Sequence, residues 1–179
     1  MIYESVQMEQ DAVMQTAMRM CAAARTAPKG RGMDHIAAMV LTGAEKDALA
    51  DKMAEVAARE YGDKPNFIRR DSGNLKAAQA VVLIGVKRAS AGLPFCSYCG
   101  FESCAACAEA GGRCAFMFLD LGIAAGSAAD VAARDHVDNR VMFSVGKVVS
   151  EMGYPGGENV TWLGIPLSVS GKSPFFDRS

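Results

Sequence analysis

Apolar side chains recur at helical spacing in the first part of the chain. Between Ser5 and Arg25 they lie three, four or seven positions apart, which predicts a helix with one buried face. Its apolar positions are Val6, Val13, Ala17, Met20, Cys21 and Ala24. A free cysteine packs as a small apolar side chain, so we expect Cys21 to belong to the protein core.

The apolar segments that follow differ in length and in period. "HIAAMVLTG" (35–43) is short and apolar and predicts a buried strand, whereas "AEKDALADKMAEVAAREYG" (44–62) predicts a helix that ends at Gly62. "NFIRRDSGNLKAAQA" (66–80) predicts a turn and a short helix. "VVLIGV" (81–86) is rich in β-branched residues, as in a strand that is buried on both faces.

Beyond residue 114 the first apolar segment predicts a long core helix. Residues 115–137 contain no proline and are apolar nearly all round. Gly122 and Gly126 lie four positions apart on one face, where another backbone or a planar ligand could approach closely.

The remaining segments are less uniform. Residues 137–153 fit both a strand period and a helix period, and we favour a helix that Asp138 begins and Gly153 ends. Residues 159–169 predict a strand. The tail from 170 to 179 carries two adjacent phenylalanines, so we expect it to dock on another surface of the chain or on a second subunit.

Composition limits the classes of protein to consider. A chain of 179 residues, 50% hydrophobic, predicts a single domain over 1–179, since a domain takes roughly 150 residues. Lys and Arg (19) nearly balance Asp and Glu (20), so we expect no nucleic-acid partner. The first ten residues are acidic and polar, unlike a signal peptide, and no uncharged run reaches about 18 residues. We therefore expect a cytoplasmic protein without a membrane segment.

Cysteines are concentrated in one segment of the chain, residues 93–114. Their spacing is C-x2-C-x4-C-x2-C-x6-C, formed by Cys96, Cys99, Cys104, Cys107 and Cys114. In the reducing cytoplasm such a cluster indicates metal binding or redox chemistry more than disulfides. Structural zinc sites usually separate two C-x2-C pairs by a dozen or more residues, whereas iron–sulfur ligands are often closely spaced. An iron–sulfur cluster is favoured over a structural zinc and over a thiol redox relay.

The type of cluster and its ligand set follow less directly. Four tightly packed cysteines favour 4Fe-4S over 2Fe-2S, although C-x4-C-x2-C also matches plant-type ferredoxins. The segment has five cysteines for four ligand positions, and the spacing does not show which cysteine is not a ligand. Apolar and aromatic neighbours are expected to screen the site from water: Leu93, Pro94, Phe95, Tyr98 and Phe101.

Outside this segment the candidate chemistry is weaker. "RTAPKGRG" (25–32) places Arg25, Lys29 and Arg31 on a turn with two glycines, which suits either a phosphate site or a solvated basic turn. His35 and His136 are expected to be structural. No nucleotide-binding glycine-rich loop occurs.

Several motifs resemble one known family. "CGFESCAACAEAGGRCAFMFLDLGIAAGSAADVAARDHVDNRVMFSVG", "AARTAPKGRGMDHI" and "WLGIPLSVSGKSPFFDR" resemble the DUF2148 family, uncharacterised proteins described as containing a ferredoxin domain. The resemblance spans nearly the whole chain. It implies an iron–sulfur centre and electron transfer.

A second resemblance concerns the fold. "AAARTAPKGRGMDHIAAMVLTGAEKDALADKM" is similar in layout to the early part of nitroreductase-like flavoproteins, which are homodimers that bind FMN. This resemblance implies an FMN phosphate or a substrate near Arg25, Lys29 and Arg31. The Arg-x-Ser-x-Arg motif that precedes the first helix in many nitroreductases is absent, so a shell that has lost flavin and gained a cluster is equally consistent.

Together these observations predict an α/β (α+β) protein with a nitroreductase-like three-layer core and an iron–sulfur loop after a central strand. We expect a homodimer that passes electrons to a partner protein, a bound flavin or a small-molecule substrate, and thus a candidate oxidoreductase. The alternative is a non-catalytic module with a structural zinc in the cysteine loop.

Overall fold

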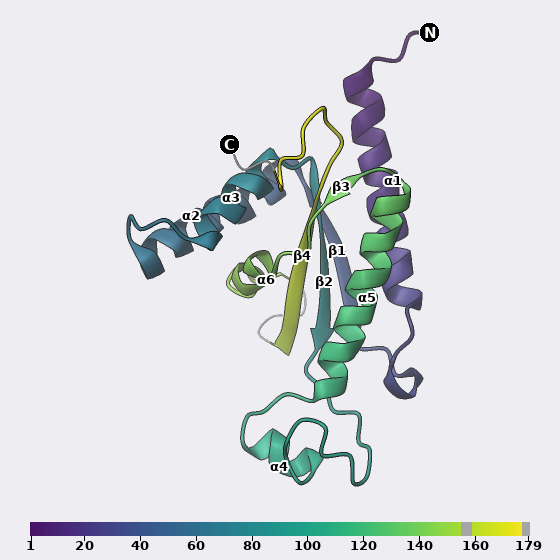
Figure 1. Cartoon of the computed structure of the whole chain (residues 1–179), viewed down its shortest axis with the longest axis vertical. Coiled ribbons are helices and arrows are strands. Elements are labelled where there is room, and N and C mark those ends of the chain that lie inside the picture. Colours follow the sequence, from purple (N-terminus) through teal and green to yellow (C-terminus); the bar gives the residue numbers. More distant parts are fainter. Residues whose placement is uncertain (155–158, 177–179) are drawn as a thin grey trace.

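The computed structural model describes residues 1–154 and 159–176 (Figure 1). Its main helices are α1 (Ser5–Thr26), α2 (Gly43–Tyr61), α3 (Phe67–Ala77), α4 (Cys104–Glu109), α5 (Ala115–Arg134) and α6 (Phe143–Val149), with a short 3-10 turn, η1 (Gly30–Gly32). Its strands are β1 (Ile36–Thr42), β2 (Ala80–Lys87), β3 (Asp138–Asn139) and β4 (Val160–Ser168). The strands form one antiparallel sheet in the order β1-β2-β4-β3.

Strand β2 lies at the centre of the sheet and is buried from Ala80 to Val86. It pairs with β1 on one side and with β4 on the other, so that Val82 lies opposite Val40 and Ile165. Val82 and Ile84 enter one hydrophobic core, and Val81 and Leu83 enter the other. Because both faces are covered, this strand can be apolar without alternation, as the sequence predicted.

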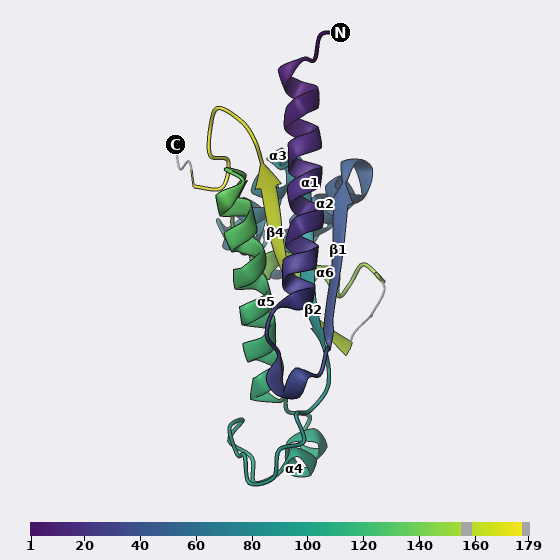
Figure 2. The same ribbon diagram turned by 90° about the vertical axis from the view of Figure 1, so that its right-hand side faces the viewer.

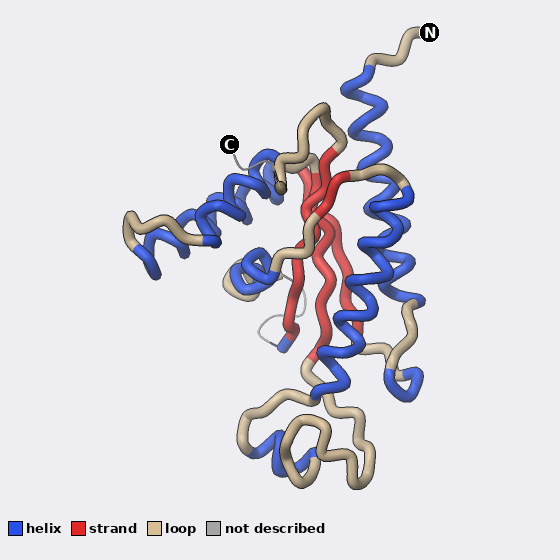
Figure 3. Tube along the Cα trace, in the orientation of Figure 1, coloured by secondary structure: helices blue, strands red, loops and turns tan. Residues whose placement is uncertain are grey.

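Helices cover the two faces of the sheet and form a three-layer arrangement (Figures 1 and 3). Helices α1 and α5 lie side by side over one face (Figure 2), while α2, α3 and α6 cover the other. Helix α5 is long and apolar enough to cross a membrane by length and composition alone. Its contacts with α1 and the sheet account for that composition, since they bury one side of it in the core.

The elements predicted from apolar periodicity in the first half are confirmed. Helix α1 buries Val13, Ala17 and Met20, although Val6 near its start is exposed. Cys21 is half-buried against the core, and burial raises the pKa of its thiol. Gly62 ends α2 with a φ of 60°.

The predicted helix over 137–153 is wrong in its first part. Asp138 and Asn139 pair with β4, and Met142 forms an isolated bridge with Gly164, so only Phe143–Val149 is helical. Met142 is buried while Val141 and Phe143 are exposed. This alternation is typical of a strand. Pairing with β4 satisfies backbone N–H and C=O groups at the edge of the sheet, which a helix would not have done.

The C-terminal tail docks on its own chain. Phe175 is buried in the core beneath α2, α3 and α6, and its carbonyl oxygen accepts a hydrogen bond of 3.0 Å from the Arg140 guanidinium. The same guanidinium lies 5.3 Å from the ring centre of the exposed Phe176. The last part of the predicted tail, 177–179, lies outside the described residues.

Helix α6 approaches β4 unusually closely through glycine. A Cβ at Gly146 would lie only 1.7 Å from the carbonyl oxygen of Trp162, and one at Gly164 would lie 2.3 Å from Val145 Cγ1. Gly122 and Gly126 on α5 differ, because a Cβ at either position would meet no described atom within 4 Å apart from its chain neighbours and the backbone of its own helix. The close approach expected at these two positions is therefore not made by the described part of the chain.

Gly146→Ala is expected to destabilise the protein by about 1–3 kcal/mol, since the added methyl group meets backbone that cannot move aside. Gly126→Ala is the matched control, a helical glycine with open space around it, and it should stabilise by up to about 1 kcal/mol. Urea unfolding of the two variants measures both changes. Equal stability of the two variants would contradict the packing described for α6.

Candidate functional site

The cysteine-rich segment projects from one end of the sheet (bottom of Figure 1). It leaves the end of β2 at Lys87 and returns to the start of α5 at Ala115, and α4 is the helix within it. All five of its cysteines are free thiols. The sheet and α5 therefore hold both ends of this segment, and the thiols lie on the connection between them.

Helix α4 places two of the thiols one turn apart. The Ser103 hydroxyl oxygen caps it by accepting a hydrogen bond of 3.1 Å from the Ala106 N–H. Cys104 is the first helical residue and Cys107 follows three positions later on the same side. Cys107 is the buried member of the pair.

Glycine lets the chain return past Cys107. Gly111 has a φ of 71°, and the Gly112 N–H donates a hydrogen bond of 2.7 Å to the Cys107 carbonyl. A Cβ at Gly112 would lie 2.8 Å from Cys107 Sγ and 2.9 Å from the Phe101 ring. Only glycine allows the backbone this close to the thiol, and the turn brings Cys114 back to the same site.

Four of the five thiols line one cavity of about 330 Å³: Cys99, Cys104, Cys107 and Cys114. Cys96 does not line it. Together with Cys99, Cys104 and Cys114, it lines a smaller hollow beside Tyr98 and Phe116. Burial raises the pKa of the Cys107 thiol, a hydrogen bond with Cys99 adds to this effect, and the other two thiols of the set add less.

Cys99 and Cys107 are joined by a hydrogen bond, but no three of the four thiols converge on one point. Within 1–154 and 159–176, no three side chains of His, Cys, Asp or Glu meet closely enough to hold a single metal ion. A single zinc would require its thiolates about 2.3 Å from one centre. A cavity lined by thiols on several sides suits a larger, polynuclear group.

Positive charge adjoins this cavity. Arg88, directly after β2, lines it, and its guanidinium lies 3.5 Å from the Gly112 carbonyl oxygen. Cys114 is the residue before the first turn of α5, a helix of 20 residues. The positive end of the helix dipole therefore lies next to Cys114, on the side of the cavity that Arg88 also lines.

The aromatic screen expected around the thiols is only partly present. Phe95 and Tyr98 are exposed to solvent, so they do not cover the cavity. Phe101 is half-buried and reaches the turn at Gly112. The backbone at Phe95 and Ser97 is left-handed, with φ of 55° and 46°.

The basic turn predicted as an anion site bonds to its own chain. Arg25 pairs with Asp34 at 2.7 Å and donates to the Ile36 carbonyl, and Lys29 donates to two carbonyls at the end of α1. Arg31 donates a hydrogen bond of 2.6 Å to the Ala91 carbonyl and so ties this turn to the cysteine segment. Anion binding at the turn stays a prediction.

The sequence reading missed two arginines next to the cysteines. Arg88 lines the thiol cavity, and Arg113 lines a larger groove on the other side of the start of α5. Their positions, one directly after the central strand and one directly before Cys114, were the available signal. Asp120 was also missed: it is buried on α5 and accepts a hydrogen bond of 2.9 Å from the Gly30 N–H.

Solved structures with similar folds include nitroreductases. A nitroreductase with bound FMN from Desulfitobacterium hafniense superposes with a TM-score of 0.58 at 15% identity, covering 88% of this chain and 78% of that one. The FMN-dependent nitroreductase of Mycobacterium smegmatis in complex with NADPH gives a TM-score of 0.56 at 14% identity, with coverage of 88% and 78%. At these identities the likeness concerns the fold, a mixed α/β fold resembling that of nitroreductases.

Sequence relatives identify the family. An uncharacterized protein of Archaeoglobus fulgidus is 39% identical over 187 aligned positions, covering 100% of this chain and 98% of its own. Residues 110–178 match the family model described as an uncharacterized protein containing a ferredoxin domain, DUF2148. The chain therefore belongs to the DUF2148 family of ferredoxin-domain proteins, and its fold resembles that of nitroreductases.

Proposed function

We propose that this protein is an iron–sulfur redox protein that binds one 4Fe-4S cluster through Cys99, Cys104, Cys107 and Cys114. One observation carries the proposal: these four cysteines line one cavity of about 330 Å³, whereas Cys96 lines only a smaller hollow, which it shares with three of them. The ferredoxin domain in the family description implies an iron–sulfur cluster and supports the same conclusion. When bound, such a cluster supplies one-electron transfer.

The donor set fits this group. Thiolate sulfur is the usual ligand of iron–sulfur clusters, and four thiols match four irons with one thiolate each. The arrangement around an open cavity favours a polynuclear cluster over the alternative of one structural zinc. In the cytoplasm, which we propose as its location, the thiols stay reduced and available.

The residues of the chain then have definite roles around the thiolates. Arg88 and the start of α5 offset the negative charge of the thiolates. Gly112 keeps Cys107 in place, and Ser103 fixes the start of the helix that carries Cys104 and Cys107. We propose an electron carrier or oxidoreductase without FMN at the basic turn, since Arg25, Lys29 and Arg31 already bond within the chain.

We further propose a homodimer formed through α1 and α5. Both helices present large apolar side chains to solvent on the outer layer: Met18 on α1, and Leu119 and Ile123 one turn apart on α5. Contiguous exposed apolar side chains are typical of interfaces between subunits.

Single Cys→Ser substitutions test the cluster and its ligand set. Replacing Cys99, Cys104, Cys107 or Cys114 should remove most of the iron, the sulfide and the visible absorption, because a hydroxyl is a poor substitute for thiolate. Cys96→Ser is the matched control within the same segment and should keep all three. Anaerobic purification followed by iron, sulfide, zinc and flavin analysis gives the result. A colourless protein with one zinc and no sulfide would contradict the proposal, and a protein that loses its cluster with Cys96 would refute this ligand set.

Arg88→Gln should make the midpoint potential of the centre more negative by an amount on the order of tens of millivolts, where about 59 mV corresponds to a tenfold change for one electron. The reduced centre carries more negative charge, so it loses more when the cation is removed. Arg88→Lys should stay near the wild-type potential, and Arg134→Gln, at the far end of α5, should not change it. Potentiometric titration provides the measurement, and an unchanged Arg88→Gln potential would contradict the role given to this residue.

Ile123→Asp should convert the dimer into monomer, because it introduces a charge into the apolar outer face of α5. Tyr61→Asp, at the end of α2 in the other layer, serves as the control and should leave the dimer intact. Light scattering after size-exclusion chromatography gives the mass. If wild type and Ile123→Asp have the same mass, this face is not the interface.

A further inference from the structure

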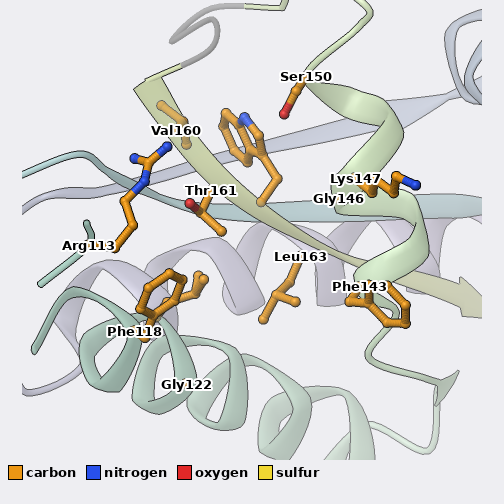
Figure 4. A pocket seen from close by; sticks show the side chains of 12 residues that line it. Arg113, Phe118, Gly122, Phe143, Gly146, Lys147, Ser150, Val160, Thr161 and Leu163 are labelled. Carbon is orange, nitrogen blue, oxygen red and sulfur yellow. The ribbon is translucent and has the colours of Figure 1, made fainter. Parts of the chain in front are cut away.

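A second hollow, separate from the thiol cavity, lies between α5, α6 and β4 (Figure 4). Its volume is about 510 Å³, within the range of small-molecule sites. Helix α5 contributes Phe118 and Gly122, α6 contributes Phe143, and β4 contributes Thr161 and Leu163. We refer to this hollow as the α5–α6 groove.

Arg113 supplies the charge of the groove. It is half-buried, and no hydrogen bond or ion pair joins it to the described part of the chain. Its side chain extends past Thr161 toward Val160 at one end of the groove (Figure 4). A guanidinium in this position is available to form bidentate hydrogen bonds with a carboxylate, sulfonate or phosphate.

The other cation of the groove is already neutralised. Lys147 on α6 pairs with Glu60 at 2.7 Å, and its amine points away from Arg113 in Figure 4. The positive charge without a partner is therefore confined to one end. A ligand with one anionic group and an otherwise apolar body would match this distribution.

The walls of the groove suit a flat body. Phe118 and Phe143 are about half exposed and offer ring faces on opposite sides, and Leu163 lies between them (Figure 4). Gly122 has no side chain, and a Cβ there would meet nothing within 4 Å, so α5 leaves flat space beside Phe118. Aromatic rings and a glycine surface favour stacking of a planar molecule.

The groove adjoins the cysteine centre. A smaller hollow between them is lined by Arg88, Arg113, Cys114, Phe118 and Thr161. Cys114 lines both this hollow and the thiol cavity, while Arg113 and Phe118 line both it and the groove. A molecule in the groove would therefore lie next to one of the four thiols.

We propose that the α5–α6 groove binds a planar organic anion, an aromatic or quinonoid compound whose single anionic group is held by Arg113 and whose ring stacks on Phe118. Charge complementarity and the flat apolar walls identify this class of ligand. Binding does not depend on what the cysteines hold, so this inference goes beyond the proposed function and can fail or succeed separately from it.

Anthraquinone-2-sulfonate is a suitable probe, and 2-(hydroxymethyl)anthraquinone is its uncharged counterpart. Calorimetric titration of the full chain under anaerobic conditions should give one saturable site for the sulfonate and binding at least roughly tenfold weaker for the uncharged compound. Added salt should weaken binding of the sulfonate.

Two pairs of variants locate the site. Arg113→Gln should weaken binding roughly tenfold, while Arg134→Gln, an exposed arginine on α5 that pairs with Asp130, should not. Gly122→Leu should abolish binding by filling the groove, while Gly126→Leu, one turn further and outside the groove, should not. Both glycine variants have space for the new side chain, so both are expected to fold.

Equal affinity for the charged and the uncharged probe, or unchanged binding to Arg113→Gln or to Gly122→Leu, would overturn the proposal. The iron and sulfide content and the oligomeric mass of the same samples should stay at wild-type levels. If a variant lost iron, dimer and binding together, its effect would be structural and would count against a specific role for that residue.

Discussion

Strand β2 is bonded along both edges and covered on both faces, and the position of every functional group depends on it. Its pairing with β1 and β4 consumes its backbone hydrogen bonds, and its side chains enter two separate cores. Burial of apolar side chains at about 25 cal/mol per Å² makes such a strand difficult to displace. The cysteine segment starts at its end, so that the first anchor of the thiols is the most buried element of the fold.

The second anchor is α5, and the two together determine what the segment can do. The chain between Lys87 and Ala115 forms its own short helix and a tight turn at Gly111 and Gly112, and four of its cysteines line one cavity. Burial and neighbouring thiols disfavour the ionised form of Cys107, which is an electrostatic cost that a bound cation can offset. The Arg88 charge and the positive end of the α5 dipole also offset this cost.

Local patterns were sufficient for most of the fold. Helical spacing of apolar residues indicated α1 and α2, and apolar runs of strand or helix length indicated β1, β2 and α5. They failed over 137–142, where pairing with β4 decided between two periods that the residues fit equally well. Spacing alone located the five cysteines but could not select four of them. Which four cysteines line one cavity depends on how the chain returns past Cys107 at Gly112, and this geometry has no local pattern.

Arg113 and Cys114 illustrate why the sequence alone could not show which cavity each side chain reaches. They are neighbours in an extended stretch before α5, and successive side chains of an extended chain point to opposite sides. Cys114 therefore reaches the thiol cavity while Arg113 reaches the groove formed by α5, α6 and β4. The elements that form this groove are distant from each other in sequence, so that no motif could have indicated it. The same alternation places the Arg113 guanidinium and the Cys114 thiol on opposite sides of the chain at the start of α5. Both residues line the small hollow between the groove and the thiol cavity, so a ligand held by Arg113 would lie next to Cys114.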